Sequence, residues 1–255
     1  MVTLKVFNPC GLPPRHEFAH APRLADLNGK TIGEISSGFW QYDRAFPLIR
    51  QLLKERFPGV TFVPYTDLPN GSHAIDVDNI GEVVAAMGCD AAIGGPSGSG
   101  SNAMTVGRSL ARIEKKGIPT FSIITTGHAG VAKTAFLGMG FSEAASCYEF
   151  PARTFLPGSD LADLAGNIDK VVDGLTTWKP PANGAAGCSL DMVAVSGRDY
   201  REASDRVNSL FLTNNWGDGL PLLPPTEERV EWVLCGTGLP RNTNIGKVLT
   251  RGGLA

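Results

Sequence analysis

The feature that most constrains the fold is an alternation of short apolar runs and helix-period segments between residues 30 and 150. Apolar side chains recur at helical spacing between the runs, as in Phe46, Ile49, Leu53 and Phe57. Strands and helices that alternate in this way form a parallel sheet with right-handed crossovers on both faces. We therefore predict an α/β protein with a flavodoxin-like, doubly wound parallel sheet of about five strands. The predicted strands are Thr31–Ile35, Val60–Val63, Cys89–Ile93, Pro119–Thr125 and Cys147–Phe150.

Stretches rich in proline and glycine divide the chain into parts. Residues 1–29 carry four prolines and are expected to form an N-terminal arm before an α/β three-layer domain over 30–177. Residues 178–189 include K-P-P-A-N-G-A-A-G, which is typical of a linker. The remainder, 190–255, is predicted to be a smaller, mainly helical C-terminal region. Because the end of the chain lacks helix periodicity, we expect either a frayed tail or a point where a longer or two-chain assembly was divided.

Composition narrows the class of protein. The 255 residues carry 23 Lys and Arg against 25 Asp and Glu, a formal charge of −2, so neither nucleic acid nor a membrane surface is indicated as a partner. No apolar run reaches the roughly 18–20 residues of a membrane span, and we expect a cytoplasmic protein. The five cysteines are widely spaced without a C-x-x-C pair, which argues against a disulfide framework or a cysteine-rich zinc site.

The stretch Ala91–Asn102 reads A-A-I-G-G-P-S-G-S-G-S-N and predicts a strand, a loop and the start of a helix. Glycines let backbone N–H groups turn toward one point, and a helix N-terminus adds positive charge, so such a loop suits a carboxylate, phosphate or oxyanion. The alternative is a tight turn formed by the glycines, with Ser101 or Asn102 as an ordinary helix cap. The candidate binding residues here are Gly95, Gly98, Ser99, Ser101 and Asn102, with Ser97 as candidate nucleophile or proton donor.

Ligands of open α/β sheets bind beyond the carboxyl ends of the strands. Those ends are expected to carry Ser36-Ser37-Gly38, Tyr65, the Ser97 loop and Thr126-Gly127-His128. His128 is the candidate acid or base, with Thr126 in substrate binding; the alternative for His128 is a capping or solvent-exposed role. Trp216 and Asp218, in N-N-W-G-D-G-L-P, are candidates for a lid or substrate wall, although that segment also fits a plain helix connection.

The segment His16-Glu17-Phe18-Ala19-His20 matches H-E-x-x-H, in which two histidines one helical turn apart bind zinc. The mechanism needs a helix, and the flanking prolines leave about two turns at most. We therefore predict neither a metal nor a cofactor, and keep His16 and His20, with His73, as an alternative metal set.

Several segments together resemble the UGSC family of selenocysteine- or cysteine-containing proteins. They are G-K-T-I-G, C-D-A-A-I-G-G, the small-residue loop, K-K-G-I-P-T and D-G-L-P-L-L-P-P-T-E-E-R-V, which span roughly residues 24–254. By position, Ser97-Gly98-Ser99-Gly100 stands where the family has U-G-S-C. Both chalcogen positions are replaced here, which leaves an oxygen nucleophile or an anion cradle. The resemblance also implies a chain that continues past the R-G-G segment, so Ala255 would be a processing or subunit boundary.

The fold is also similar to one half of an aspartate/glutamate-racemase-like enzyme, although the facing thiols such enzymes need are missing. From all this we expect a hydrolase or lyase that acts on a small polar substrate bearing a carboxylate or carbonyl. The alternatives are a non-catalytic anion-binding subunit of a hetero-oligomer and a metal-dependent hydrolase. The expected partners are the substrate and either further copies of the chain or a second polypeptide.

Overall fold

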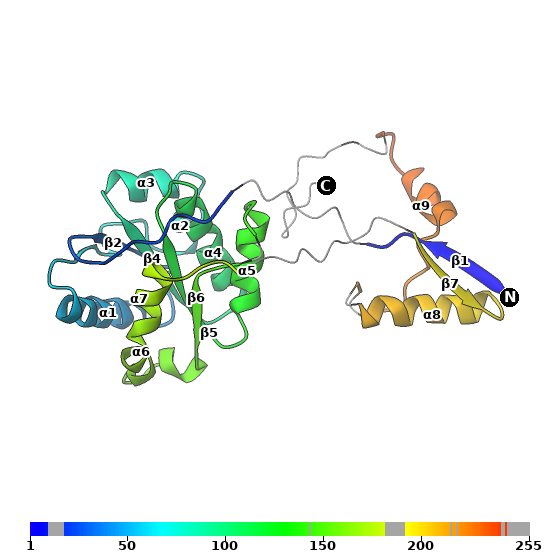
Figure 1. Cartoon of the computed structure of the whole chain (residues 1–255). Coiled ribbons are helices and arrows are strands. Elements are labelled where there is room, and N and C mark those ends of the chain that lie inside the picture. Colours follow the sequence, from blue (N-terminus) through cyan, green and yellow to red (C-terminus); the bar gives the residue numbers. More distant parts are fainter. Residues whose placement is uncertain are drawn as a thin grey trace. The chain divides into compact units, whose positions relative to one another are not determined.

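The computed structural model describes residues 1–9, 18–142, 144–181, 192–214, 216–217, 219–240 and 243. The chain divides into two units (Figure 1). The larger is built on Pro14–Gly184, and the smaller combines Met1–Pro13 with Ala185–Val248.

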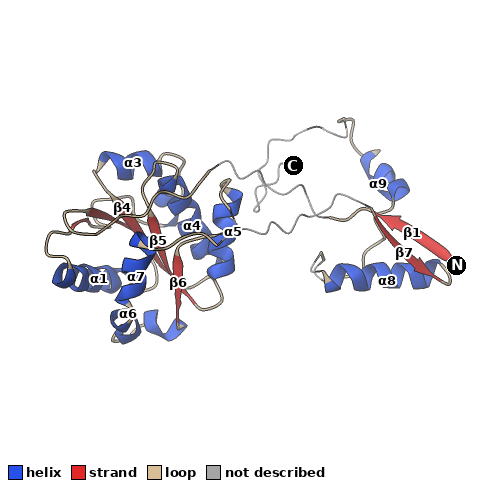
Figure 2. Cartoon of the chain, in the orientation of Figure 1, coloured by secondary structure: helices blue, strands red, loops and turns tan. Residues whose placement is uncertain are grey.

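The larger unit contains a sheet of five parallel strands in the order β3-β2-β4-β5-β6 (Figure 2). Counted from the first strand of this unit, that is the order 2-1-3-4-5 of flavodoxin-like folds. The predicted doubly wound parallel sheet is therefore confirmed. The strands are β2 (Thr31–Ile35), β3 (Thr61–Val63), β4 (Ala91–Ser97), β5 (Thr120–Thr125) and β6 (Cys147–Phe150).

Successive side chains of the strands point to opposite faces of the sheet, so both faces are apolar and both are covered by helices. Ile32 and Ile93 point into a cluster with α1, α6 and α7, whereas Ile35 and Ala92 point into a cluster with α2, α3, α4 and α5. A short 3₁₀ turn, η1 (Ala152–Phe155), follows β6. The helices are α1 (Tyr42–Arg56), α2 (Ser72–Ile75), α3 (Ile80–Ala86), α4 (Gly100–Glu114), α5 (Ala129–Gly138), α6 (Ala162–Gly166) and α7 (Ile168–Thr176).

Helix α4 lies directly on β4. A Cβ atom at Gly94 would stand 2.8 Å from side-chain carbons of Val106 and Leu110, so only glycine permits this approach. Only Gly98 and Ser99 separate the end of β4 from the start of α4. The N-terminus of α4 is thereby held at the carboxyl end of the sheet's central strand.

The smaller unit contains β1 (Val2–Val6) paired antiparallel with β7 (Val193–Gly197), together with α8 (Tyr200–Thr213) and α9 (Glu227–Leu234). Its apolar core includes Leu4, Val6 and Phe211. The structure differs here from the irregular arm expected at the N-terminus, since alternating side chains of V-T-L-K-V bury Leu4 and Val6 against α8. The C-terminal region is mainly helical, as predicted. None of the described helices is long and apolar enough to cross a bilayer.

Candidate functional site

The switch point of the sheet lies between β2 and β4. Helix α1, which follows β2, packs on one face of the sheet, and α4, which follows β4, packs on the other. Chains that leave neighbouring strands in opposite directions open a crevice at the carboxyl ends, where ligands of such folds bind. The structure thus brings together the loops after β2 and after β4, both of which were singled out from the sequence.

Ser99 and Asn102 organise the start of α4. The Ser99 hydroxyl accepts a hydrogen bond from the Asn102 backbone N–H over 3.4 Å and donates one to Asn102 Oδ1 over 3.1 Å. Asn102 in turn donates from Nδ2 to the hydroxyl of Ser37 over 3.0 Å. Ser99 is therefore the N-cap of α4, in place of Ser101 or Asn102, which the alternative interpretation of the loop named. The same contacts fix the first turn of α4 against the end of β2.

A cavity of about 600 Å³ lies beside this contact, and we name it the Ser37 pocket. Its walls come from the loop after β2, from the start of α2 and from the first turns of α4. No carboxylate is among the described residues that line it, and its one titratable side chain is the exposed His73. The lining residues are Ser37, Gly38, Phe39, Gly71, Ser72, His73, Ser101, Asn102 and Thr105.

Ser97 is the last residue of β4 rather than a loop residue. It pairs with Ile124 of β5 after an irregularity in the ladder that begins at Gly94, and such bulges re-aim side chains. The side chain is fully buried, and its Oγ has no hydrogen-bond partner among the described residues. His128 therefore does not hydrogen-bond Ser97 in this structure. A nucleophilic role for Ser97 stays a prediction.

Two glycines predicted to bind substrate have packing roles. A Cβ atom at Gly95, whose φ is +114°, would stand 2.3 Å from the carbonyl oxygen of Ile123. A Cβ atom at Gly98 would stand 2.5 Å from the indole ring of Trp40. Both positions thus require glycine for contact with neighbouring elements, which accounts for two of the glycines in the loop.

His128 lies at the carboxyl end of β5, as predicted, just before α5. Its Nδ1 lies 3.1 Å from the hydroxyl of Thr125. The carboxylate of Glu149 accepts hydrogen bonds from the backbone N–H groups of Gly127, His128 and Ala129 over 2.8, 3.0 and 2.9 Å. The anion-binding position at the start of α5 is therefore filled by the protein's own carboxylate.

Sequence reasoning missed Glu149. It is an inner residue of a short strand, and no local pattern indicates which helix N-terminus a strand carboxylate will reach. Thr126 was predicted to bind substrate; its hydroxyl donates to the carbonyl of Phe150 over 3.2 Å, which ties the loop to β6.

The predicted lid residues fall in the smaller unit. Trp216 packs its ring edge-on against Phe211, with ring centroids 5.5 Å apart. Asp218 lies outside the described residues, and its role stays a prediction.

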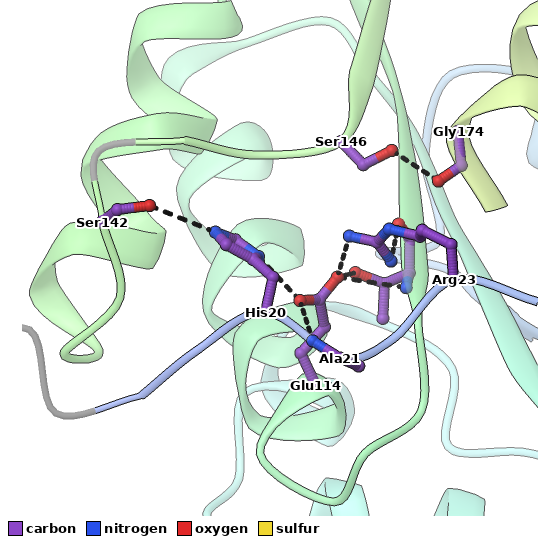
Figure 3. A network of polar contacts seen from close by, with 8 residues as sticks. His20, Ala21, Arg23, Glu114, Ser142, Ser146 and Gly174 are labelled. Atoms are coloured by element: carbon purple, nitrogen blue, oxygen red, sulfur yellow. Dashed lines mark hydrogen bonds and ion pairs between the residues drawn. The ribbon is translucent and has the colours of Figure 1, made fainter. Parts of the chain in front are cut away.

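The histidines of the H-E-x-x-H match are not paired on a helix. His16 lies outside the described residues, and Phe18 to His20 form no helix. His20 Nδ1 lies 2.7 Å from Glu114 Oε2, with both side chains buried (Figure 3). No cluster of three His, Cys, Asp or Glu side chains able to hold a metal occurs within the described part of the chain.

Two cysteines of the larger unit are poor nucleophiles. Burial raises the pKa of the Cys89 thiol to about 11, with a smaller contribution from the charge of Asp90. Burial likewise raises the pKa of Cys147 to about 11. Since the thiolate is the reactive form, both remain inert thiols at neutral pH.

The family model of the UGSC family matches residues 5–175, which include the whole parallel sheet. No curated protein and no solved structure matches the chain.

Proposed function

The chain belongs to the UGSC family, and from that premise and the geometry of the Ser37 pocket we propose that it is an enzyme of the lyase or hydrolase type. Its substrate would be a small polar molecule that bears a carboxylate or a carbonyl. The observation that best supports this is the lining of the pocket. The cavity lies at the N-terminus of α4, and its lining combines hydroxyls, one amide, one imidazole and the ring of Phe39, with no carboxylate among the described lining residues.

The start of α4 would hold the negatively charged group of the substrate. The first N–H groups of a helix have no partner within it, and they carry about half a positive charge. Ser101, in the first turn, lines the pocket and adds a hydroxyl. Ser37 accepts a hydrogen bond from Asn102, so its own proton is free to be donated to the substrate.

His73 would be the acid or base of the reaction. An imidazole titrates near neutral pH and can take a proton from the carbon beside the bound carboxylate or carbonyl. The negative charge that develops on the substrate oxygen would be stabilised by Ser37 and by the start of α4. A lyase would then expel a leaving group from the next carbon, and His73 or water would protonate that group.

The state of Ser97 favours lyase chemistry over hydrolysis through a covalent intermediate. A serine nucleophile needs a base within hydrogen-bond reach, and the buried Ser97 hydroxyl has no partner among the described residues. His73, by contrast, lines the cavity, where it could act as an acid or base on a bound substrate.

The test is proton exchange in heavy water. Short-chain 2-oxo, 2-hydroxy and 2-amino acids are incubated with the full chain, and loss of the Cα or Cβ proton signal is followed by NMR. At least one acid that raises the Tm of the wild type should also exchange its Cα or Cβ proton for deuterium in the presence of the wild type. His73→Ala should slow that exchange by about 10²-fold or more while the acid still raises the Tm. His128→Ala is the matched control and should leave exchange unchanged.

Two other outcomes would contradict the proposal. Stabilisation by an acid with neither exchange nor turnover would instead support an anion-binding subunit. Loss of exchange in His128→Ala with normal exchange in His73→Ala would move the acid or base role to the β5 loop.

A further inference from the structure

A second cavity, of about 710 Å³, lies elsewhere in the larger unit and is independent of the proposed function. It is bounded by the segment that leads toward β2 and by the segment after α7. His20 and Arg23, in its wall, contact Glu114 and Thr120, which end α4 and begin β5. The cavity is therefore near the amino end of β5, whereas the Ser37 pocket is at the carboxyl ends of the strands. We name it the Trp178 pocket; it is lined by Phe18, Ala19, His20, Ala21, Pro22, Arg23, Ser142, Thr176, Thr177, Trp178, Lys179 and Pro180.

Aromatic rings give this pocket an apolar wall. The ring of His20 meets Trp178 edge-on, with ring centroids 5.0 Å apart. The guanidinium of Arg23 lies over the Trp178 ring, 4.6 Å from its centroid. Phe18, also in the wall, is 39% exposed. A cavity of this size, with aromatic walls and several polar side chains, is typical of a site for a small organic molecule.

The charge of the lining is positive. Arg23, Lys179 and His20 line the pocket, and no Asp or Glu is among the described lining residues. Glu114 lies behind this wall with a fully buried side chain, and Figure 3 shows His20 and Arg23 pointing toward it from the same strand-like segment. Glu114 therefore pairs with Arg23 and His20, whereas Lys179 adds a positive charge to the lining.

One nitrogen of the Arg23 guanidinium has no hydrogen-bond partner among the described residues. It donates from Nη2 to Glu114 Oε1 over 2.9 Å and from Nη1 to the carbonyl of Thr120 over 3.4 Å. The side chain is only 7% exposed, and its Nε–H has no partner within the described part of the chain. Because Nε is itself buried, Arg23 offers the cavity the positive charge of its guanidinium and not this donor.

We propose that the Trp178 pocket binds a small organic acid with an aromatic or branched apolar body. The carboxylate would pair with the exposed Lys179, beside the positive charge of the Arg23 guanidinium. The apolar body would lie against Trp178 and Phe18. The site takes an anion that carries an apolar group, whereas the lining of the Ser37 pocket includes neither Lys nor Arg.

The test compares phenylacetate with its neutral isostere phenylacetamide by isothermal titration calorimetry on the full chain. Phenylacetate should bind about tenfold more tightly than the amide, as expected for one charged hydrogen-bonded contact. Lys179→Ala should reduce that preference to about threefold or less. Trp178→Leu should weaken both ligands about tenfold, and His73→Ala, in the Ser37 pocket, should change neither.

Three results would overturn the proposal. The first is equal binding of acid and amide, and the second is no binding of either at millimolar concentration. The third is binding that His73→Ala abolishes and Trp178→Leu leaves intact, which would place the acid in the Ser37 pocket. Urea unfolding checks that each variant is folded. Lys179 is exposed, so Lys179→Ala decides the matter if Trp178→Leu does not fold.

Discussion

The side-chain amide of Asn102 donates a hydrogen bond to the hydroxyl of Ser37 over 3.0 Å, and both side chains are buried. This contact joins the first turn of α4 to the segment after β2, across the switch point of the sheet. Both residues also line the Ser37 pocket. The contact therefore connects the stability of the larger unit to the shape of the proposed site.

Replacing Asn102 tests this connection. Asn102→Ala leaves the buried Ser37 hydroxyl without its donor, so the free energy of unfolding should fall by about 1–2 kcal/mol in urea. Asn102→Asp also cannot donate to Ser37, but it keeps an acceptor for Ser99 and places a negative charge at the start of α4, which stabilises a helix. Asn102→Asp should therefore be the more stable variant and yet lose binding of small acids. Acid binding by Asn102→Asp at the wild-type level would contradict the anion site.

Ser97→Ala separates the structural role of Ser97 from its chemical role. The mutation removes a buried hydroxyl without a partner, so the free energy of unfolding should stay constant or rise by about 1 kcal/mol. Proton exchange on the substrate should continue if His73 is the base. Loss of exchange in a folded, equally stable Ser97→Ala variant would restore Ser97 as the reactive group. Ser109→Ala is a suitable comparison, because that buried hydroxyl donates to the Ile75 carbonyl over 2.8 Å. Its removal should lower the free energy of unfolding.

The elements of the sheet were predictable because short strand segments, of which β2, β4 and β5 are almost fully buried, alternate with helix-period segments. The predicted strand Cys147–Phe150 is β6, with the same bounds. The strand β1 was missed because its partner β7 lies at the far end of the sequence, and nothing near Val2 indicates such a pairing. The end of β4 was placed too early because G-G-P-S reads as a turn, whereas the ladder bulges there and continues to Ser97.

In the candidate site, too, local features could be predicted from the sequence and contacts between separate elements could not. The sequence alone offered Ser101 or Asn102 as the helix cap, whereas the helix begins at Gly100 and its N-cap is Ser99. The contacts of Ser37 with Asn102 and of Glu149 with the β5 loop join separate elements, and no local pattern encodes them. His73 enters the pocket on α2, a short helix without a strong sequence pattern.

Glu114 should make the protein sensitive to acid. Burial raises its pKa, but the hydrogen bond from His20 and the charge of Arg23 outweigh burial, so the pKa lies below its usual value. A lowered pKa gives stability that is present above about pH 4.3 and lost as the pH falls through the folded-state pKa. Glu114→Gln should lower the free energy of unfolding at pH 7 by about 3 kcal/mol, because Arg23 loses its buried partner. Between pH 5 and about pH 3, the variant should then lose less stability than the wild type.

Glu34 is the matched control for that titration. It is equally buried, but burial dominates and its pKa is raised, despite the hydrogen bond from Tyr65 and the charge of Arg50. A raised carboxyl pKa means that the folded state gains protons first, so this group favours folding as the pH falls. Glu34→Gln should therefore make the acid loss steeper, opposite to Glu114→Gln. If the free energies of unfolding of the two variants, measured in urea, changed with pH in parallel, neither carboxyl would control the acid sensitivity of the protein.

Removal of Glu149 should convert the start of α5 into an open anion site. Three backbone N–H groups lose their shared acceptor in Glu149→Ala, so the free energy of unfolding should fall by about 1–3 kcal/mol. Acetate or formate should then raise the Tm of the variant in proportion to the logarithm of its concentration, because the ion binds only the folded state. The wild type should show a smaller rise, since at the start of α5 its own carboxylate fills the position. Glu149→Gln keeps a neutral acceptor oxygen and should show intermediate stability with little response. An equal rise in Tm for wild type and Glu149→Ala would place the ion elsewhere.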